Sequence, residues 1–477
     1  MTFHKRTMAG AGRIARRGLP VAVVALLLPL GACNVDKILR IEDPDVATPA
    51  SVNDTTALPA VYGGAVGDFE LAYAGSGSTG GGGGGEGQIL LSGLLGDEFY
   101  SADTFDTRSE IDNRTIRLST SGGSSNGQLE DAERYLQRAR VAAENGAARF
   151  AGLGRVNVLE RSELLSLAGY AYVMFGENYC NGVTFSNVPL GGGATVYGTP
   201  LSGPEVFQLA LARFDSALAI ANATTTAGPG ASKADLVNLA KVGRGRALLD
   251  LGQFANAAAA VAGVPTSFEY DIEYSDNTTS QENGTWAYTV DLRRYGVSNA
   301  EGGSGIAYRT LGKRTDAAGG AGDTRVLYRS GGAPFDATVA GPLWAQQKYA
   351  DRAAPVPLAT GSEARLIEAE AAYQAGQFGT FLTALNAQHP GGGLVDPGTA
   401  AGRVSLLFQE RALSLWLTSH RLGDERRLMR QYGYTEASAF PSTADSHGDP
   451  YGHDKNLPLF VDEANNPNFV GCTNRNP

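Results

Sequence analysis

Aromatic and polar side chains alternate through residues 266–357, and these residues are well suited to binding chemistry. Flat rings stack on the apolar faces of a sugar, while amide, carboxylate and guanidinium groups hydrogen-bond to its hydroxyls. Trp286, beside Asn283, is the strongest single candidate. The other candidate binding residues are Asn283, Tyr274, Tyr288, Tyr295 and Tyr308, with Phe99, Tyr100 and Phe105 forming a second rim. The alternative is that these rings pack in small cores, the commoner role of aromatic side chains in structured loops.

We assign no catalytic residue. No pair of the many carboxylates in the sequence stands out as an acid and a base. One charged cluster has the spacing of ion pairs along a helix, which predicts a structural role for Glu410, Arg411, Arg421, Asp424 and Arg427. The sequence therefore predicts a protein that is not an enzyme.

The segment 445–454 is dense in potential metal ligands. Its histidines and carboxylates have side chains that ligate metal ions, and they are Asp445, His447, Asp449, His453 and Asp454. A solvated loop is the alternative, and it is the one that we favour on sequence grounds. We therefore predict neither a metal nor a cofactor.

The N-terminus has the pattern of an export signal. Basic residues precede the apolar run Leu19–Leu30, which is too short to span a bilayer. The run leads into Leu30-Gly31-Ala32-Cys33, which resembles a bacterial lipobox and predicts a signal peptide over 1–32 with lipidation of Cys33. A soluble secreted protein with an incidental cysteine is the alternative. Without the first 32 residues, 34 basic residues face 49 acidic ones, a net charge of about −15, which argues against a nucleic-acid partner.

Two further cysteines, Cys180 and Cys472, lie in sequence rich in asparagine and glycine. An exported protein with an even pair of cysteines favours a disulfide between them. Two free thiols are the alternative.

Helical hairpins are predicted to carry these loops. Residues 238–265 have small residues at helical spacing, then Leu251-Gly252-Gln253-Phe254, and end at Pro265, which is typical of a tetratricopeptide-type repeat. A second copy lies at 370–385, where Gly376-Gln377-Phe378 matches Gly252-Gln253-Phe254. One such hairpin cannot bury its apolar stripe alone. The sequence therefore predicts a mainly α fold, an α–α superhelix of hairpins with a long loop-rich insert at about 266–357, and one last long helix over 403–430.

Several blocks of the mature chain resemble the SusD/RagB family of outer-membrane nutrient-binding lipoproteins. They are the lipobox, the run LLSGLLGDEFY, the helix and turn of 159–190, the segment 322–376, and the tail of 454–468. The most specific block is 410–427, in which Glu410-Arg411, Arg421, Asp424 and Arg427 fall in register. Ser414, Thr418 and Ser419 depart from the family's two glutamates and glycine.

This resemblance implies one SusD/RagB-like domain over 33–477, built of four tetratricopeptide-type helical pairs and a loop-rich binding face. It also implies a lipid-anchored protein of the cell outer membrane that faces the exterior. Such a protein captures an oligosaccharide, or a peptide, and hands it to a SusC-like TonB-dependent transporter. The alternative is a tetratricopeptide-type scaffold lipoprotein for protein–protein interaction in the envelope, although a scaffold has little use for the aromatic insert.

Overall fold

The computed structural model describes residues 54–78, 85–120, 122–188, 193–228, 230–300, 305–317 and 320–476, all within the compact unit Pro49–Pro477. The predicted signal peptide at 1–32 and the predicted lipidation site Cys33 lie outside the described residues. No helix of the described part of the chain is long and apolar enough to cross a bilayer. Helices dominate over a few short strands, which confirms the predicted mainly α class.

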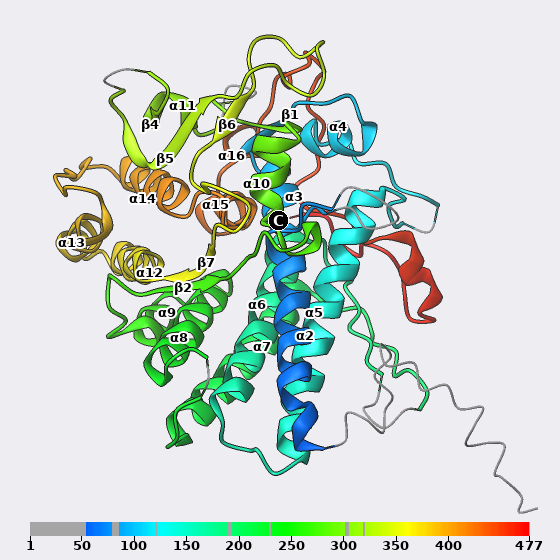
Figure 1. Ribbon diagram of the computed structural model, residues 1–477. Helices are drawn as coiled ribbons and strands as arrows, with labels where there is room; N and C mark the ends of the chain where they lie inside the picture. The colour runs from blue at the N-terminus through cyan, green and yellow to red at the C-terminus, as the bar shows by residue number, and fades with distance from the viewer. Residues whose placement is uncertain are drawn as a thin grey trace, which may run out of the picture. The chain divides into compact units, whose positions relative to one another are not determined.

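Long helices pack in sequence order along one side of the molecule (Figure 1). α2 packs against α5, α5 against α6, α6 against α7, and α7 against α8. Their bounds are α2 (Leu58–Tyr73), α5 (Gly127–Gly152), α6 (Leu159–Asn178), α7 (Gly203–Ala223), α8 (Lys233–Asp250), α9 (Phe254–Val261), α12 (Gly361–Gln374) and α13 (Phe378–Gln388). The chain thus forms stacked helical hairpins, as predicted.

The two predicted repeats are the hairpins α8–α9 and α12–α13. Each turns at a glycine with positive φ, 70° at Gly252 and 71° at Gly376, where a residue with a side chain would be strained. Small residues let the helices lie close: a Cβ on Gly243 would lie 2.4 Å from the ring of Phe214 on α7. α12 packs against both α8 and α9, so each hairpin buries its apolar face on the other.

Side-chain caps fix where several of these helices begin. Ser202 and Glu205 form a capping box at α7, with Glu205 accepting from the amide of Ser202 at 2.8 Å. The hydroxyls of Ser232 and Thr360 accept backbone amides at the first turns of α8 and α12. These caps satisfy amides that have no partner inside the helix.

The aperiodic insert folds into short elements. They are β2 (Glu269–Ile272), η2 (Thr279–Gln281), α10 (Gly284–Trp286), η3 (Ala287–Asp291), β3 (Tyr295–Val297), α11 (Tyr308–Leu311), β4 (Gly312–Arg314), β5 (Asp323–Ser330), β6 (Trp344–Gln346) and β7 (Val356–Thr360). β2 pairs with β7 in antiparallel fashion, and β5 pairs with β4 in parallel and with β6 in antiparallel fashion. β3 pairs outside the insert with β1 (Phe99–Ser101), which follows α3 (Gln88–Leu95) and precedes α4 (Asp106–Asp112).

The predicted long helix over 403–430 is wrong, because the structure divides it into α14 (Ala400–Ser414) and α15 (Arg421–Tyr432). Between them Leu417 and Ser419 have positive φ, 56° and 59°. The carbonyls of this buried linker accept side-chain donors from elsewhere in the core: Tyr349 reaches Leu417 at 2.6 Å, and Arg246 reaches Ser419 at 2.8 Å. These tertiary hydrogen bonds replace the helical ones.

The C-terminal segment returns to the end of α6 after α16 (Glu436–Ala439) and η5 (Val461–Asn465). The amide of Cys180 donates to Leu457 at 3.0 Å, and that of Asn181 donates to Asn474 at 3.0 Å. Cys180 and Cys472 form a disulfide in this structure. The covalent bond therefore joins the last residues of the chain to the helical core.

Candidate functional site

Two phenylalanines stand exposed side by side on the loop-rich part of the fold. Phe105 precedes α4 and is 49% exposed, and Phe335 lies between β5 and β6 and is 48% exposed. Their ring centroids are 6.2 Å apart, with the planes inclined at 45°. The large apolar side chains exposed in the described part of the chain include three aromatic ones, Phe105, Phe335 and Tyr197, so two of the three are in contact. We call Phe105, Phe335 and Arg294 the aromatic platform.

Arg294 completes the platform. Its guanidinium carbon lies 3.9 Å from the ring centre of Phe335 and 5.0 Å from that of Phe105. Arg294 Nη1 also donates to Asp103 Oδ2 at 2.9 Å, and the Asp103 side chain is fully buried. Arg108 Nη1 donates to the same oxygen at 3.0 Å. A buried carboxylate with two guanidinium partners thus fixes Arg294 against the rings.

Backbone hydrogen bonds join the three loops that carry the platform. Ala102 donates to the carbonyl of Arg294 at 2.8 Å, and Phe335 donates to that of Arg293 at 3.0 Å. Asp336 closes the set by donating to Ala102 at 3.0 Å. The same loops bury a small second core of Tyr100, Ala102, Val339, Leu343 and Ala345. The platform is therefore held by strand pairing and packing rather than by one flexible loop.

The platform combines an apolar surface with polar groups at its edge. The half-exposed rings offer faces or edges for the apolar side of a ligand, and the Arg294 side chain, 16% exposed, offers hydrogen-bond donors beside them. Asp336 adds an acceptor, and hydrogen bonds from the amide and hydroxyl of Thr338 lower the pKa of its carboxyl. This chemistry suits a ligand with both apolar faces and hydroxyl or amide groups.

Six of the nine side chains expected to bind ligand are buried instead. Asn283, Tyr295 and Tyr308 are 0% exposed, and the others are Phe99 (1%), Tyr288 (2%) and Tyr100 (4%). Their rings pack on other core rings: Tyr295 lies 5.8 Å from Phe99, and Tyr308 lies 6.2 Å from Trp416. A buried ring has no face free for a sugar, so the structure corrects these assignments to the packing role that was the alternative.

Of the other three, Phe105 belongs to the exposed platform, while Trp286 and Tyr274 are half-buried. The guanidinium of Arg352 lies 5.4 Å from the Trp286 ring centre, and Asn283 accepts from the Trp286 amide at 3.0 Å as the cap of α10. The Tyr274 hydroxyl donates to the carbonyl of Glu70 at 2.8 Å, which ties the insert to α2. Trp286 stays a candidate ligand contact, whereas the hydroxyl of Tyr274 is engaged in a structural hydrogen bond.

Sequence reasoning did not find Phe335. The residue stands alone between Pro334 and Asp336, without the neighbouring aromatic residues that marked the other candidates. Its partner Phe105 belongs to the second rim that the sequence predicts with Phe99 and Tyr100. The available signal was the pairing of an isolated phenylalanine with glycine-rich flanks, which is typical of exposed loops.

The cluster predicted to be structural is a buried ion-pair network. Arg427 donates to Glu370 at 2.6 Å and to Asp424 at 2.9 Å, and Arg411 donates to Asp424 at 2.8 Å. Arg421 pairs with Asp97 at 3.0 Å, and Glu410 accepts from Arg325 at 2.7 Å. These pairs fasten α14 and α15 to the rest of the fold and give the cluster its predicted structural role, although of them only Arg427–Asp424 lies at helical spacing.

A hydroxyl, an imidazole and a carboxylate do come together at Thr418, His420 and Glu363, beside a polar pocket of about 270 Å³. His420 Nδ1 lies 2.9 Å from the carbonyl oxygen of Thr418, which only accepts. The Thr418 hydroxyl donates to the Leu415 carbonyl at 2.5 Å, so its proton is engaged away from the imidazole. The arrangement is unsuited to activating a nucleophile.

Solved structures with the same fold carry the name SusD. A SusD-like protein from Bacteroides fragilis is 13% identical, with a TM-score of 0.60 over 90% of this chain and 98% of that one. A SusD-like carbohydrate-binding protein from Bacteroides vulgatus is 13% identical, with a TM-score of 0.57 over 87% and 97%. A SusD/RagB family protein from Bacteroides thetaiotaomicron is 13% identical, with a TM-score of 0.58 over 86% and 94%.

No protein-family model matches the sequence, and no curated protein matches it. The likeness therefore lies in the three-dimensional structure, and it confirms the SusD/RagB resemblance at the level of the fold. At these identities the chain has the SusD-type helical architecture, while its binding face has to be read from its own residues.

Proposed function

We propose that this protein is a surface-exposed outer-membrane lipoprotein that captures an oligosaccharide, or a peptide, and delivers it to a partner TonB-dependent transporter. One observation carries the proposal: Phe105 and Phe335 are exposed and in contact, with Arg294 against both rings, on a fold shared with a SusD-like carbohydrate-binding protein. Exposed apolar surface of this kind is typical of a ligand-binding site, where a bound ligand removes it from water.

An oligosaccharide is the favoured ligand class. Pyranose rings have flat C–H faces that stack on aromatic rings, and their hydroxyls both donate and accept hydrogen bonds. Arg294 supplies donors and Asp336 an acceptor beside the rings. A peptide with an aromatic or proline side chain and an acidic neighbour meets the same requirements, and it is the second ligand class.

The proposal is non-enzymatic, because binding and transfer need no covalent step. The anchor is the diacylglycerol carried by Cys33, which places the domain on the exterior face of the outer membrane beside its transporter, a SusC-like channel. Transport energy then comes from the TonB-dependent channel, and this chain contributes ligand affinity and selection.

A glycan and peptide array probed with the soluble 34–477 fragment tests the ligand class. We expect signals confined to a few related oligosaccharides, or to a few peptides, that disappear in Phe105→Ala/Phe335→Ala. Isolation of the full-length protein from detergent-extracted outer membranes tests the partner, with a TonB-dependent transporter as the expected companion. An array without any reproducible signal, or signals that the double variant retains, would contradict the capture role of the platform.

One observation favours the scaffold alternative. A groove of about 620 Å³ lies between the two repeat hairpins, lined mainly by small residues of α9, α12 and α13, among them Ala258, Ala372 and Ala384. Grooves between tetratricopeptide-type hairpins bind protein segments in general. Ala258→Arg and the exposed Ala387→Arg obstruct this groove without touching the platform, so they separate the two functions: a scaffold loses its protein partner, whereas glycan capture persists.

A further inference from the structure

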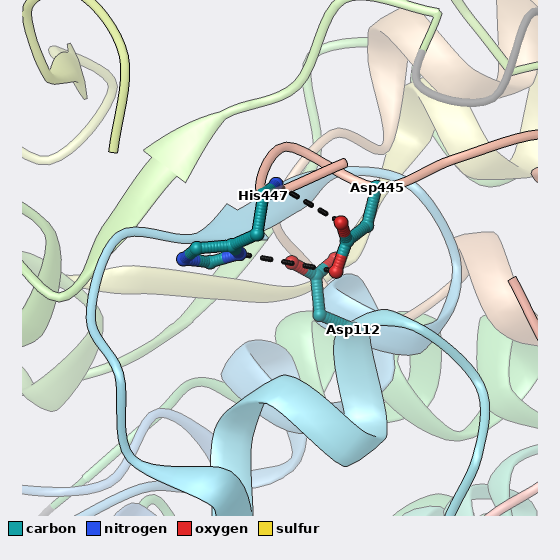
Figure 2. Close-up of side chains that lie close together, drawn as sticks. All are labelled: Asp112, Asp445 and His447. Carbon is teal, nitrogen blue, oxygen red and sulfur yellow. Dashed lines mark hydrogen bonds and ion pairs between the residues drawn. The ribbon is translucent and has the colours of Figure 1, made fainter. Parts of the chain in front are cut away.

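Three side chains from two distant parts of the sequence converge at one place (Figure 2). Asp112 is the last residue of α4, while Asp445 and His447 lie in the loop that follows α16. One carboxylate oxygen of each aspartate and one ring nitrogen of the histidine all lie within 4.8 Å of one another. The loop belongs to the segment 445–454, which is dense in potential metal ligands, and α4 supplies the third member, which the sequence did not reveal.

The Asp445 carboxylate is buried and only half satisfied. Its side chain is 1% exposed. Oδ1 accepts the backbone amides of His447 at 2.9 Å and Asp449 at 2.8 Å. Oδ2 is buried without a hydrogen bond, and the nearest imidazole nitrogen, His447 Nδ1, lies 3.8 Å away, too far for one. The loose ion pair with His447 leaves this buried oxygen without a hydrogen bond, which is costly, so the arrangement calls for a cation between these groups.

The charges around His447 are acidic. Asp445, Asp112 and Asp449 lie near the imidazole and interact with it electrostatically. Asp336 of the platform loop also interacts electrostatically with His447. Two carboxylates held together in a buried place repel each other, and a divalent cation removes that repulsion by ligating both.

We propose that Asp112, Asp445 and His447 form a binding site for one divalent transition-metal cation of the Mn²⁺ or Zn²⁺ type. An imidazole with two carboxylates suits these ions, whereas Ca²⁺ and Mg²⁺ favour oxygen ligands alone. Metal–ligand bonds of about 2.0–2.2 Å place two ligand atoms at most about 4.4 Å apart, so small side-chain rotations close the observed spacing. Three protein ligands leave the remaining positions to water or to an oxygen of a bound molecule.

The site is linked to the platform through β1 and the residue that follows it. The amide of Ser101 donates to Asp112 Oδ2 at 2.7 Å, and Ser446 Oγ donates to the Ser101 carbonyl at 3.4 Å. The next residue, Ala102, accepts from Asp336 beside Phe335 at 3.0 Å. A bound cation would therefore fix the Asp445–His447 loop against α4 and, through this segment, the base of the platform. The proposal does not depend on the identity of the ligand.

Two other potential ligands of the same loop are engaged elsewhere. His453, with a side chain 89% exposed, pairs with Glu436 at 3.0 Å, and Asp454 pairs with Arg475 at 2.8 Å. His453 is therefore the matched control, since it is a histidine of the same loop outside the convergent group.

Metal binding to the purified protein tests the proposal. Protein treated with EDTA and dialysed is titrated with MnCl₂, with the electron paramagnetic resonance signal of free Mn²⁺ as readout, and with ZnCl₂ by calorimetry. We expect one equivalent to bind, with His447→Ala and Asp112→Asn each weakening affinity at least about tenfold. His453→Ala should bind as the parent does, and the parent should gain thermal stability with metal.

Two outcomes would overturn the proposal. One is an affinity weaker than about 1 mM for both ions, which would leave the cluster as a simple His447–Asp445 ion pair. The other is unchanged affinity in His447→Ala, which would mean an adventitious surface ion. Melting of the metal-free variants shows whether they fold. Asp112→Asn keeps the side-chain volume and an acceptor for Ser101, so it carries the test if the histidine variant does not fold.

Discussion

The rings of Phe105 and Phe335 lie 6.2 Å apart, and each is about half exposed. Arg294 lies against both rings while its charge is paired with the buried Asp103. Two exposed aromatic residues brought together from distant loops, and held there by strand pairing, form a preorganised surface. Little conformational entropy is then lost when a ligand binds.

Phe335→Ala should weaken glycan binding about tenfold, because one stacking ring with its covered apolar area contributes on the order of 1.4 kcal/mol. Thermal unfolding should change little, since the ring is half exposed and its removal opens no buried cavity. Calorimetric titration with a glycan identified on an array measures the affinity, and differential scanning fluorimetry measures the melting temperature.

Tyr197→Ala is the matched control for this prediction, since Tyr197 is another aromatic residue of similar exposure, 47%, away from the platform contacts. It should leave affinity unchanged. Equal losses in both variants, or a large fall in melting temperature for Phe335→Ala with intact affinity, would count against the platform.

The helical scaffold was predictable from sequence because its signals are local. Gly252-Gln253-Phe254 and Gly376-Gln377-Phe378 mark both hairpin turns, and the two glycines indeed adopt positive φ. Close contacts such as Gly243 with Phe214 follow from the same small-residue pattern. The spacing of apolar residues and the residue types of the turns depend only on neighbours in the sequence, so both can be recognised without the tertiary structure.

The candidate site was less predictable because burial is decided by tertiary packing. Tyr295 and Tyr308 have the same local sequence character as exposed binding residues, yet they fill the core under the insert. The helix break at Leu417 and Ser419 likewise depends on hydrogen-bond donors that lie far away in the sequence. Ser419 occupies the position where the resemblance to the SusD/RagB family implies a glycine, and its positive φ of 59° is a conformation that favours glycine.

Cys33→Ser should move the protein from the membrane fraction to the soluble fraction, because acyl chains on this residue are the predicted anchor. Cells that express the variant are fractionated, and labelled palmitate incorporation is followed in parallel. Loss of label should accompany the release. A variant that remains in the membrane fraction, without label, would show that another contact retains the protein there.

Cys472→Ser should lower the free energy of unfolding by about 2–4 kcal/mol, because the disulfide to Cys180 closes a chain segment of 292 residues. Denaturant unfolding measures the difference. The serine variant should be insensitive to dithiothreitol, whereas the parent should fall to the level of the variant when reduced. A parent whose stability does not change on reduction would contradict a stabilising bond.

Glu98 is expected to make the free energy of unfolding fall as the pH rises, the opposite of the usual effect of an ion-paired carboxylate. The residue accepts the amide of Leu417 at 2.8 Å, its second oxygen is buried without a hydrogen bond, and burial raises its pKa from 4.5 to about 8. In the unfolded chain the carboxyl ionises near its usual pKa, while in the folded protein it stays protonated. Between about pH 4.5 and 8 the folded state therefore binds one proton more than the unfolded state.

Stability from this group is thus present below about pH 4.5 and is lost as the pH rises, by about 1.4 kcal/mol per pH unit, until the folded carboxyl ionises near pH 8. Glu98→Gln cannot ionise and keeps an acceptor for Leu417, so it should become progressively more stable than the parent from pH 5 to 7.5. Asp276→Asn, at an exposed position, is the control and should stay parallel to the parent. Urea unfolding across this range measures the difference. A Glu98→Gln curve that runs parallel to the parent would mean that the carboxylate is ionised inside the fold, stabilised there by the nearby charges of Lys348 and Arg421.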